Sequence, residues 1–589
     1  GGEWLFGPDV TARYGGGLMW IATVAIVLQV FYNIECGRYA LYTGEPVFTG
    51  FMRTRPGPRF WICVTMLLSI GMLIPGLSSN AAVLIASMYR NRPVTTTTFN
   101  EGDTLFVRTA DSASPGAADD FASVNQATKC IVRAASDHNG ADGEFLVMTR
   151  TGNEVTLSGR TAPEAQVQLL TSGGRDLVPV HAADSLPAVA VADQAGLWTI
   201  RFYDDSFLVN GLAYTLLGLI VLPVLIGGKV YNMLQVVMTT KVVLVLSFCL
   251  AIGVFMVGRE GWSAIFSGFL QFGNVPVSME GGEGVANILT HWWNTGEFLT
   301  IELASIATLG AFAGYAGGGG LGNSTYSNFV RDKGWGMGSR VGAIASAIGG
   351  KQITLSHIGK VFVLTEENLA RWKRWWKYIL FDQLLIWFPG CVMGMALPAL
   401  MSIEFSRRSP LYRTDIPYAQ SLVTADGMRL STELGAWSGI LWMLALFIGI
   451  MVFLPSQISI VDDFARRWTD ILWSSSDRVR GRMKPGQVSR LYYLLLGAYV
   501  LWSFVSATIF LRFGQGPKLM VIVIANLNNV GLGATSFHLW WINRRFLPKP
   551  LQPKWYSQAG ILMCGFFYCG MALLVFMAKV IPLLSGSEG

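Results

Sequence analysis

The chain has 589 residues, of which 52% are hydrophobic and only 14% are charged. Because a soluble domain carries about 25% charged residues, this composition indicates an integral membrane protein. The formal net charge of +7 does not indicate a nucleic-acid partner, since lysine and arginine are concentrated in short loops between apolar segments, as the positive-inside rule expects.

A membrane-spanning helix needs about 20 mostly apolar residues, and ten segments have this length and composition. The chain begins without methionine, and its first residues read as the second half of an earlier helix, which brings the expected total to about eleven. We therefore expect helices 1 (partial) to 3 within residues 1–90 and helices 4 to 11 within residues 207–589. The ten segments lie near residues 15–44, 61–89, 207–227, 231–257, 299–327, 375–402, 435–458, 491–513, 518–541 and 557–585.

Basic residues mark alternate loops and thereby give an orientation. The loops at 45–60, 328–374 and 459–490 are rich in lysine and arginine, whereas the loop at 258–298 is poor in them. Because positively charged loops stay in the cytoplasm, we expect the chain to start inside and to end outside. The basic and aromatic stretch at 369–377 has the composition of an interfacial anchor for anionic lipid.

Residues 91–206 are a polar stretch on the outer side, between the third and fourth helices. Alternating apolar and polar runs at 144–148, 154–157, 165–170 and 198–202 are typical of short strands, and they predict a β-sandwich-like extracytoplasmic insert. Its segments VTLSGRTAPEAQVQLL and DQAGLWTIRF are weakly similar to bacterial Ig-like repeats. Such an insert would bind a protein partner or stabilise the membrane part.

The segment 314–323, GYAGGGGLGN, stands in the middle of an expected spanning helix. Each glycine costs a helix interior roughly 1 kcal/mol relative to alanine, and freed backbone at membrane depth is tolerated only where protein buries it or where it lines a cavity. Close helix packing is the alternative use of small residues, but four in a row exceed that need. We predict that the helix unwinds, as at transporter substrate sites, around Gly317, Gly318, Gly319 and Gly320.

The first residues carry a family resemblance. EWLFGPDVTARYGGGLMWI, which is Glu3 to Ile21, resembles the region between the first two helices of the Nramp (natural resistance-associated macrophage protein) family of proton-coupled divalent metal transporters. LQVFYNIECGRYALYTGEPV is similar to the end of that family's second helix. The resemblance implies a LeuT/APC-type inverted repeat with broken helices, and it covers the membrane segments but not the insert.

The family's metal-binding motifs are altered in this chain. On an ungapped match Gly1 and Gly2 take the proline and glycine positions of the family's first broken helix, and Glu3 takes its asparagine position. The methionine and histidine of the family's sixth helix have no counterpart near residues 319–321. The soft thioether ligand that favours transition metals is thus missing from that segment, so the resemblance indicates the family's architecture and puts its manganese and iron chemistry in doubt.

Candidate binding residues gather at the two breaks. A carboxylate at membrane depth marks an ion path by default, so Glu3, beside Gly2, is our candidate metal ligand for a hard divalent cation; pairing with a buried basic or amide group is an equal alternative. Tyr315 and Asn323 would line the second break, although an asparagine is equally an ordinary helix cap. Asn526 of the tenth helix is a further candidate, with bonding between helices as the leading alternative.

Two other polar groups have structural interpretations. Asp462 and Asp463, followed by Arg466 and Arg467, read as the salt-bridged end of the eighth helix at the membrane interface. Residues 382–383, near the inner third of the seventh helix, suit either a proton route or a polar crevice near the cytoplasmic surface.

The cysteines, histidines and motifs argue against an enzyme. Six of the seven cysteines lie in apolar segments, and Cys130 stands alone in the polar stretch, so neither a disulfide framework nor a paired-cysteine metal site is expected. The five histidines are scattered. Nucleophile-elbow, phosphate-loop and zinc-helix motifs do not occur in a credible context. We therefore expect no enzyme activity, and a bound divalent cation is the one cofactor that the candidate residues suggest.

These features predict a secondary transporter in the inner membrane of a bacterium. It would move a metal cation, expected to be divalent, or a small solute coupled to a cation, by alternating access. The alternative is a transport-incompetent Nramp-like subunit that serves a larger membrane assembly through residues 91–206. Loss of the family's methionine and histidine favours the alternative, whereas retention of both glycine breaks opposes it.

Overall fold

The structure is a computed structural model. It describes residues 3–94, the eight strands between residues 104 and 203, and residues 205–582 apart from positions 221, 226–229, 280–281, 298, 304, 345–353, 410, 413–418 and 513–516. Within this part, eight helices are long and apolar enough to cross a membrane, and two shorter apolar helices accompany them. The membrane-protein class that the composition predicted is thereby confirmed at the level of helix length and hydropathy.

Each predicted apolar segment corresponds to one helix or to a bent group of helices. Up to the insert these are α1 (Glu3–Tyr14), α2 (Trp20–Thr43), α3 (Val47–Phe51), α4 (Pro58–Leu68), the short 3-10 helix η1 (Ile70–Leu73) and α5 (Gly76–Arg90). After the insert come α6 (Ser206–Leu219), α7 (Leu222–Leu225), α8 (Val230–Met256), α9 (Arg259–Gly268), the hairpin β9 (Asn274–Met279) and β10 (Gly282–Asn287), and α10 (Ile288–Thr295).

Beyond α10, every regular element among the described residues is a helix. These helices are α11 (Ile306–Tyr315), η4 (Gly320–Thr325), α12 (Tyr326–Asp332), α13 (Gly338–Val341), α14 (Glu366–Phe381), the π-helix η5 (Asp382–Trp387), α15 (Phe388–Phe405), η6 (Ser406–Arg408), α16 (Ser421–Arg429), η7 (Thr432–Trp437), α17 (Ser438–Ser475), α18 (Asp477–Arg482), η8 (Pro485–Gln487), α19 (Val488–Arg512), α20 (Pro517–Phe546), η9 (Lys549–Leu551), α21 (Trp555–Val575) and the π-helix η10 (Phe576–Val580).

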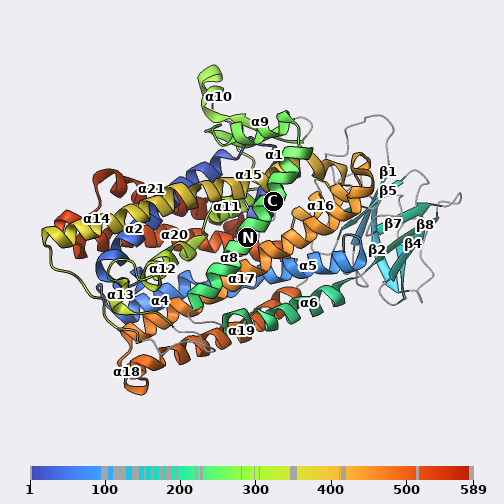
Figure 1. The fold of residues 1–589 in the computed structure, drawn as a ribbon. Coiled ribbons are helices and arrows are strands. Elements are labelled where there is room, and N and C mark those ends of the chain that lie inside the picture. Colours follow the sequence, from blue (N-terminus) through green and yellow to red (C-terminus); the bar gives the residue numbers. More distant parts are fainter. Residues whose placement is uncertain are drawn as a thin grey trace.

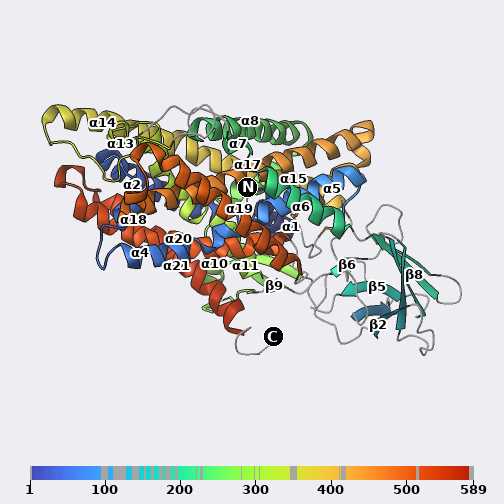
Figure 2. The same ribbon diagram turned by 90° about the horizontal axis from the view of Figure 1, so that it is seen from below.

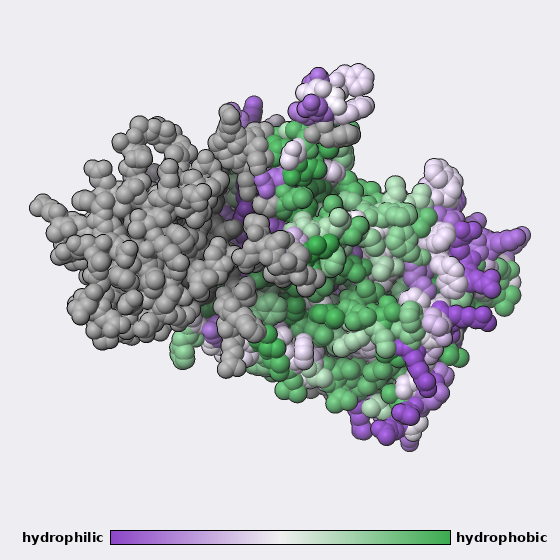
Figure 3. Space-filling model, turned by 180° about the vertical axis from the view of Figure 1, so that it is seen from behind, coloured by the Kyte–Doolittle hydropathy of each residue, from purple (hydrophilic) through white to green (hydrophobic). Residues whose placement is uncertain are grey.

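The long helices lie side by side in an elongated body (Figure 1, Figure 2). In it α20 packs against α21 and α11, α1 packs against α15, and α17 packs against α5 and α19. Large apolar side chains remain exposed on the flanks, among them Phe255 (83%), Leu501 (71%) and Leu385 (64%). Figure 3 shows hydrophobic residues over the flank and hydrophilic residues at the end where α14 and α18 lie. Such a belt fits a bilayer around the middle of the body.

The insert begins and ends at one buried ion-pair cluster. Arg90 is the last residue of α5 and Arg92 lies two residues further on, and both contact Asp205, which directly precedes α6, with N–O distances of 3.2 and 2.9 Å. The Asp205 side chain is fully buried. The cluster holds the entry and exit of the polar stretch together, close to the predicted boundaries at 91 and 206.

The described strands of the insert form one mixed sheet in the order β6-β5-β1-β2-β3-β4-β8-β7, in which only β2 and β3 are parallel. The four runs predicted as strands fall in β3, β4, β5 and β8, which confirms them as strands. Hydrogen bonds join all eight in a single sheet, rather than in the two separate sheets of a sandwich. They are β1 (Thr104–Thr109), β2 (Thr128–Ala134), β3 (Phe145–Thr151), β4 (Glu154–Arg160), β5 (Ala165–Leu170), β6 (Leu177–Pro179), β7 (Ala188–Ala192) and β8 (Leu197–Tyr203).

The predicted interruption of the helix at 299–327 is confirmed. α11 ends at Tyr315, and after a short unwound stretch the chain continues as η4 and α12. Gly319 and Gly320 have φ angles of +75° and +53°, a backbone region that is costly for residues with a Cβ. A Cβ on Gly320 would also lie 2.4 Å from the Cβ of Asn528. Glycine is thus needed here both for its backbone angles and for close approach to α20.

α17 is longer than its apolar segment predicted. It has 38 residues, or about 57 Å at 1.5 Å per residue, against roughly 30 Å of hydrocarbon. Asp462, Asp463, Arg466 and Arg467 therefore stand inside the helix and are buried. Their predicted salt bridges are confirmed, but their placement at the end of the helix was wrong, because α17 continues beyond them to Ser475.

Candidate functional site

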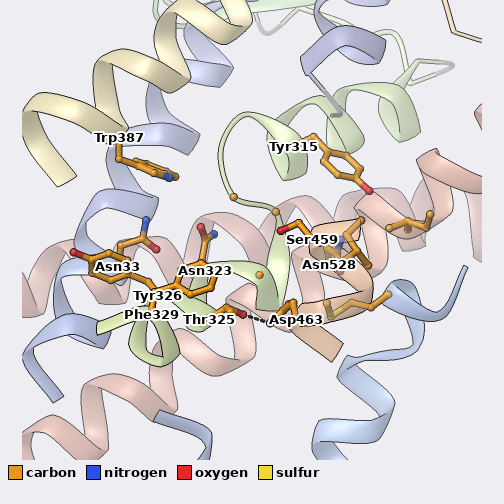
Figure 4. Close-up of a pocket in the computed structure, with 16 residues that line it drawn as sticks. Asn33, Tyr315, Asn323, Thr325, Tyr326, Phe329, Trp387, Ser459, Asp463 and Asn528 are labelled. Atoms are coloured by element: carbon orange, nitrogen blue, oxygen red, sulfur yellow. Dashed lines mark hydrogen bonds between the residues drawn. The ribbon is translucent and has the colours of Figure 1, made fainter. Parts of the chain in front are cut away.

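A cavity of about 260 Å³ lies beside the break between α11 and η4 (Figure 4). Elements that are far apart in sequence meet around it, namely α2, the broken segment, α17 and α20. Most of its lining is polar or aromatic, which is unusual inside an apolar body. The lining residues are Asn33, Met72, Tyr315, Gly318, Gly319, Gly322, Asn323, Thr325, Tyr326, Phe329, Trp387, Ser459, Ile460, Asp463, Ile524 and Asn528.

Gln29 of α2 holds the unwound stretch in place. Its Oε1 accepts hydrogen bonds from the Gly318 N–H at 2.9 Å and from Asn323 Nδ2 at 2.8 Å, and its Nε2 lies 2.5 Å from the hydroxyl of Tyr568 on α21. Backbone donors freed at membrane depth need partners, and Gln29, which is fully buried, supplies one. The break is therefore held by a side-chain bond from a neighbouring helix.

Two amide side chains present acceptor atoms at the cavity. Asn33, one helical turn after Gln29, donates from Nδ2 to Gln383 Oε1 at 2.9 Å, while its own Oδ1 has no hydrogen-bond donor among the described residues. The Oδ1 of Asn528 on α20 is likewise buried without a protein donor in the described part of the chain. An unpaired buried amide oxygen costs roughly 1–3 kcal/mol, and a donor or a cation bound beside these two atoms would offset that cost.

The other two asparagines of α20 serve the packing of the helices. Asn526 Nδ2 donates to the backbone carbonyl of Ala307 at 2.9 Å, and Asn529 Nδ2 donates to that of Gly310 at 2.8 Å. Both bonds join α20 to α11. Asn526 thus lies against α11 and outside the cavity lining, so its predicted place in the site was wrong. Asn528 lines the cavity instead.

Asp463 of α17 is the one carboxylate among the described residues that line the cavity. It accepts a hydrogen bond from the Thr325 hydroxyl of η4, drawn as a dashed line in Figure 4. Behind it, Arg467 Nη2 lies 2.7 and 2.6 Å from its two oxygens. This carboxylate therefore joins α17 to the chain just after the break.

Further ion pairs continue from Asp463 toward the polar end of the body. Arg466 binds Asp462, one helical turn before it, and Asp332 at the end of α12. Arg331 binds both Asp332 at 2.8 Å and Asp470 of α17 at 2.5 Å. All these side chains are at most 4% exposed. They fasten α12, the half-helix that follows the break, to the second half of α17.

The start of α1 lies close to the second break. The ring of Phe6 stacks on that of Tyr315, with centroids 5.8 Å apart and an interplanar angle of 23°. Glu3 is the first residue of α1, and its side chain lies outside the described residues, as does Gly2. The stacking brings the beginning of α1 beside the cavity wall; the first predicted break, at Gly1 and Gly2, lies outside the described residues.

Of the other predicted residues, Tyr315, Gly318, Gly319 and Asn323 all line the cavity. Gly317 and Gly320 belong to the same unwound stretch but lie outside the lining; they pack instead against Gln29 and Asn528. The second break thus brings together the residues that were predicted for it.

The ligand chemistry is oxygen-rich. Within the described residues no group of three or more His, Cys, Asp or Glu side chains could hold a metal ion by itself. One thioether does line the cavity, that of Met72 in η1, but its Sδ is 3.0 Å from Arg467 Nη1. The lining as a whole offers a cation one carboxylate, amide side chains and hydroxyl groups.

Sequence reasoning missed Gln29 and Asn33, gave Asp463 only a structural role, and preferred Asn526 to Asn528 within the asparagine cluster of the tenth helix. Gln29 and Asn33 could have been found, because they are polar and four residues apart in an otherwise apolar run, which places them on one helix face. The comparisons add no further residues: neither a scan of protein-family models nor a search of curated proteins finds a match for this chain.

Proposed function

We propose that this protein is a secondary transporter that moves a cation across the membrane by alternating access, with the cation held in the cavity beside the broken helix. The observation that carries the proposal is the set of unsatisfied acceptors there. The oxygens of Asn33 and Asn528 lack protein donors among the described residues, and a carboxylate stands with them. Acceptors without donors favour a ligand that donates hydrogen bonds or brings positive charge; together with a carboxylate they suit a hard cation, which prefers oxygen ligands.

The interrupted helix supports transport rather than static binding. Discontinuous helices at the middle of a bundle form the substrate sites of many transporters, because their free peptide groups bind ions and their halves can move separately. We propose a LeuT/APC-type inverted repeat of about eleven helices, in which α1 and the segment α11–η4–α12 are the two broken helices. This is the architecture that the Nramp resemblance implies, together with proton coupling.

The distribution of charge suggests how the protein is oriented. We place the basic end at α14 and α18 in the cytoplasm, by the positive-inside rule, and the strand-rich insert on the periplasmic side of a bacterial inner membrane. There the insert would be available to a protein partner.

Flux into liposomes tests the proposal. Purified protein would be reconstituted, and uptake of Mg²⁺, Ca²⁺, Mn²⁺ and Na⁺ would be followed with ion-sensitive dyes. We expect uptake of at least one divalent cation, and we expect Asp463→Asn to abolish it. Glu433→Gln is the matched control, because Glu433 is an exposed carboxylate, far from the cavity lining, that pairs with Arg408. Absence of flux for all four cations with correctly folded protein would refute the proposal.

A second candidate is a transport-incompetent subunit that acts through its insert. Two observations favour it: the cavity carboxylate already has Arg467 as its counter-ion, and three acidic or soft ligands do not converge in the described part of the protein. Under this alternative the liposomes show no flux, and Asp463→Asn changes only stability.

A further inference from the structure

Arg467 is a buried cation placed directly behind the cavity carboxylate. Its side chain is 2% exposed, and it is not among the described residues that line the cavity. Besides both oxygens of Asp463, it contacts the backbone carbonyl of Leu321 in η4 at 2.7 Å and the Thr325 hydroxyl at 3.2 Å. Its guanidinium also lies 5.0 Å from the ring centroid of Phe48.

These contacts fix the guanidinium where it stands. Arginine presents its donors in a rigid planar fork, and here the fork is shared between α17, the segment after the break and η1. Removal of Asp463 would not free Arg467, because the Leu321 carbonyl and the Met72 sulfur still hold it. The positive charge is therefore a permanent part of the cavity wall.

Asp463 and Arg467 together make this part of the cavity wall nearly neutral before any ligand binds. A lone carboxylate facing a water-poor cavity would bind a divalent cation tightly, because charges attract strongly at low effective dielectric. With Arg467 in place, an entering cation has to compete with the guanidinium for the Asp463 carboxylate, which lowers the affinity for the cation. A transport site must hold its ion weakly enough to release it, and a built-in counter-ion achieves this.

We propose that Arg467 sets the cation affinity of the cavity, as the resident counter-ion of Asp463. The inference rests on the proposed cation transport and deepens it. Because the Thr325 hydroxyl of η4 donates to the same carboxylate, a cation that draws Asp463 away also loosens this tie between α17 and the segment after the break. Arg467 is a positioning residue: it acts on the ion through Asp463 and makes no contact with it.

Calorimetric titration of Mg²⁺ into the purified protein tests this role. We expect Arg467→Gln to bind Mg²⁺ about tenfold or more tightly than the unaltered protein, since a unit charge a few ångströms away is worth more than one tenfold step. Arg467→Lys keeps the charge and should stay within about threefold of the unaltered protein. Arg38→Gln is the matched control, because Arg38 is also a buried arginine paired with a carboxylate of its own helix, Glu35, and it should leave Mg²⁺ affinity unchanged.

Loss of one partner from a buried ion pair can prevent folding, whereas loss of both is better tolerated. If Arg467→Gln does not fold, Asp463→Asn and the double variant Asp463→Asn/Arg467→Gln carry the test. Asp463→Asn should show no measurable Mg²⁺ binding, and the double variant should regain weak binding because the uncompensated positive charge is gone. The proposal is overturned if Arg467→Gln binds no more tightly than the unaltered protein, if Arg38→Gln tightens binding equally, or if the double variant binds no better than Asp463→Asn. Absence of Mg²⁺ binding and flux in every variant would instead refute the proposed transport.

Discussion

Replacing Gly320 by alanine probes the geometry of the break most sharply. The residue has a φ of +53°, and alanine in this region costs about 1–2 kcal/mol. The added Cβ would lie 2.4 Å from Asn528 Cβ and 2.6 Å from its Cγ, and overpacking of this kind costs about 1–3 kcal/mol. We therefore expect Gly320→Ala to lower the free energy of unfolding by about 2–5 kcal/mol and to push Asn528 out of the cavity wall.

The assay is thermal unfolding of the purified protein in detergent, combined with cation uptake into liposomes. Gly394→Ala is the matched control, because Gly394 lies inside α15 and an added Cβ there would meet no atom within 4 Å. It should be neutral or stabilising by up to about 1 kcal/mol. Equal unfolding midpoints for the two variants, or full uptake with Gly320→Ala, would refute the geometry described for the break.

Three further predictions concern side chains that hold the helices together. Asn529→Ala removes a bond between α20 and α11 and should cost about 0.6–2 kcal/mol in thermal unfolding while cation uptake by the folded fraction persists; loss of uptake without loss of stability would contradict its structural role. Gln29→Leu leaves the Gly318 N–H unpaired and should cost about 1–3 kcal/mol, whereas an unchanged unfolding midpoint would show that Gln29 does not hold the break. Asp9 and Lys518 form a buried ion pair at 2.9 Å, so Lys518→Met alone should cost about 3–5 kcal/mol and Asp9→Leu/Lys518→Met clearly less; purely additive losses in this double-mutant cycle would rule out the pairing.

The sequence was sufficient to predict the apolar helices and the position of the break. Both depend on local properties, since spanning length follows from a continuous apolar run and the break follows from four glycines that helices disfavour. The strands of the insert could be predicted for the same reason, because alternation of apolar and polar residues is a local pattern.

The site could be predicted only in part, because its assembly depends on helix rotation and on partners that are distant in sequence. Successive residues of a helix are 100° apart, so Asn526 and Asn529 face α11 while Asn528 faces the cavity. Composition alone does not reveal how α20 is rotated about its axis, and therefore which asparagine faces the cavity. The burial of Asp463 was missed because its charged neighbours resemble a helix end, whereas their counter-ions on α12 allow α17 to continue through them.

The central claim is that a cation binds between Asp463, Asn33 and Asn528 beside the unwound glycines. The most direct measurement is an experimental density map of the protein with Mn²⁺, an ion that carboxylate and carbonyl oxygens bind well, recorded so that its anomalous signal locates the ion. We predict a single strong peak inside the cavity, next to Asp463, that disappears in Asp463→Asn. A cavity filled by side chains, or a peak that persists elsewhere in both proteins, would contradict the account.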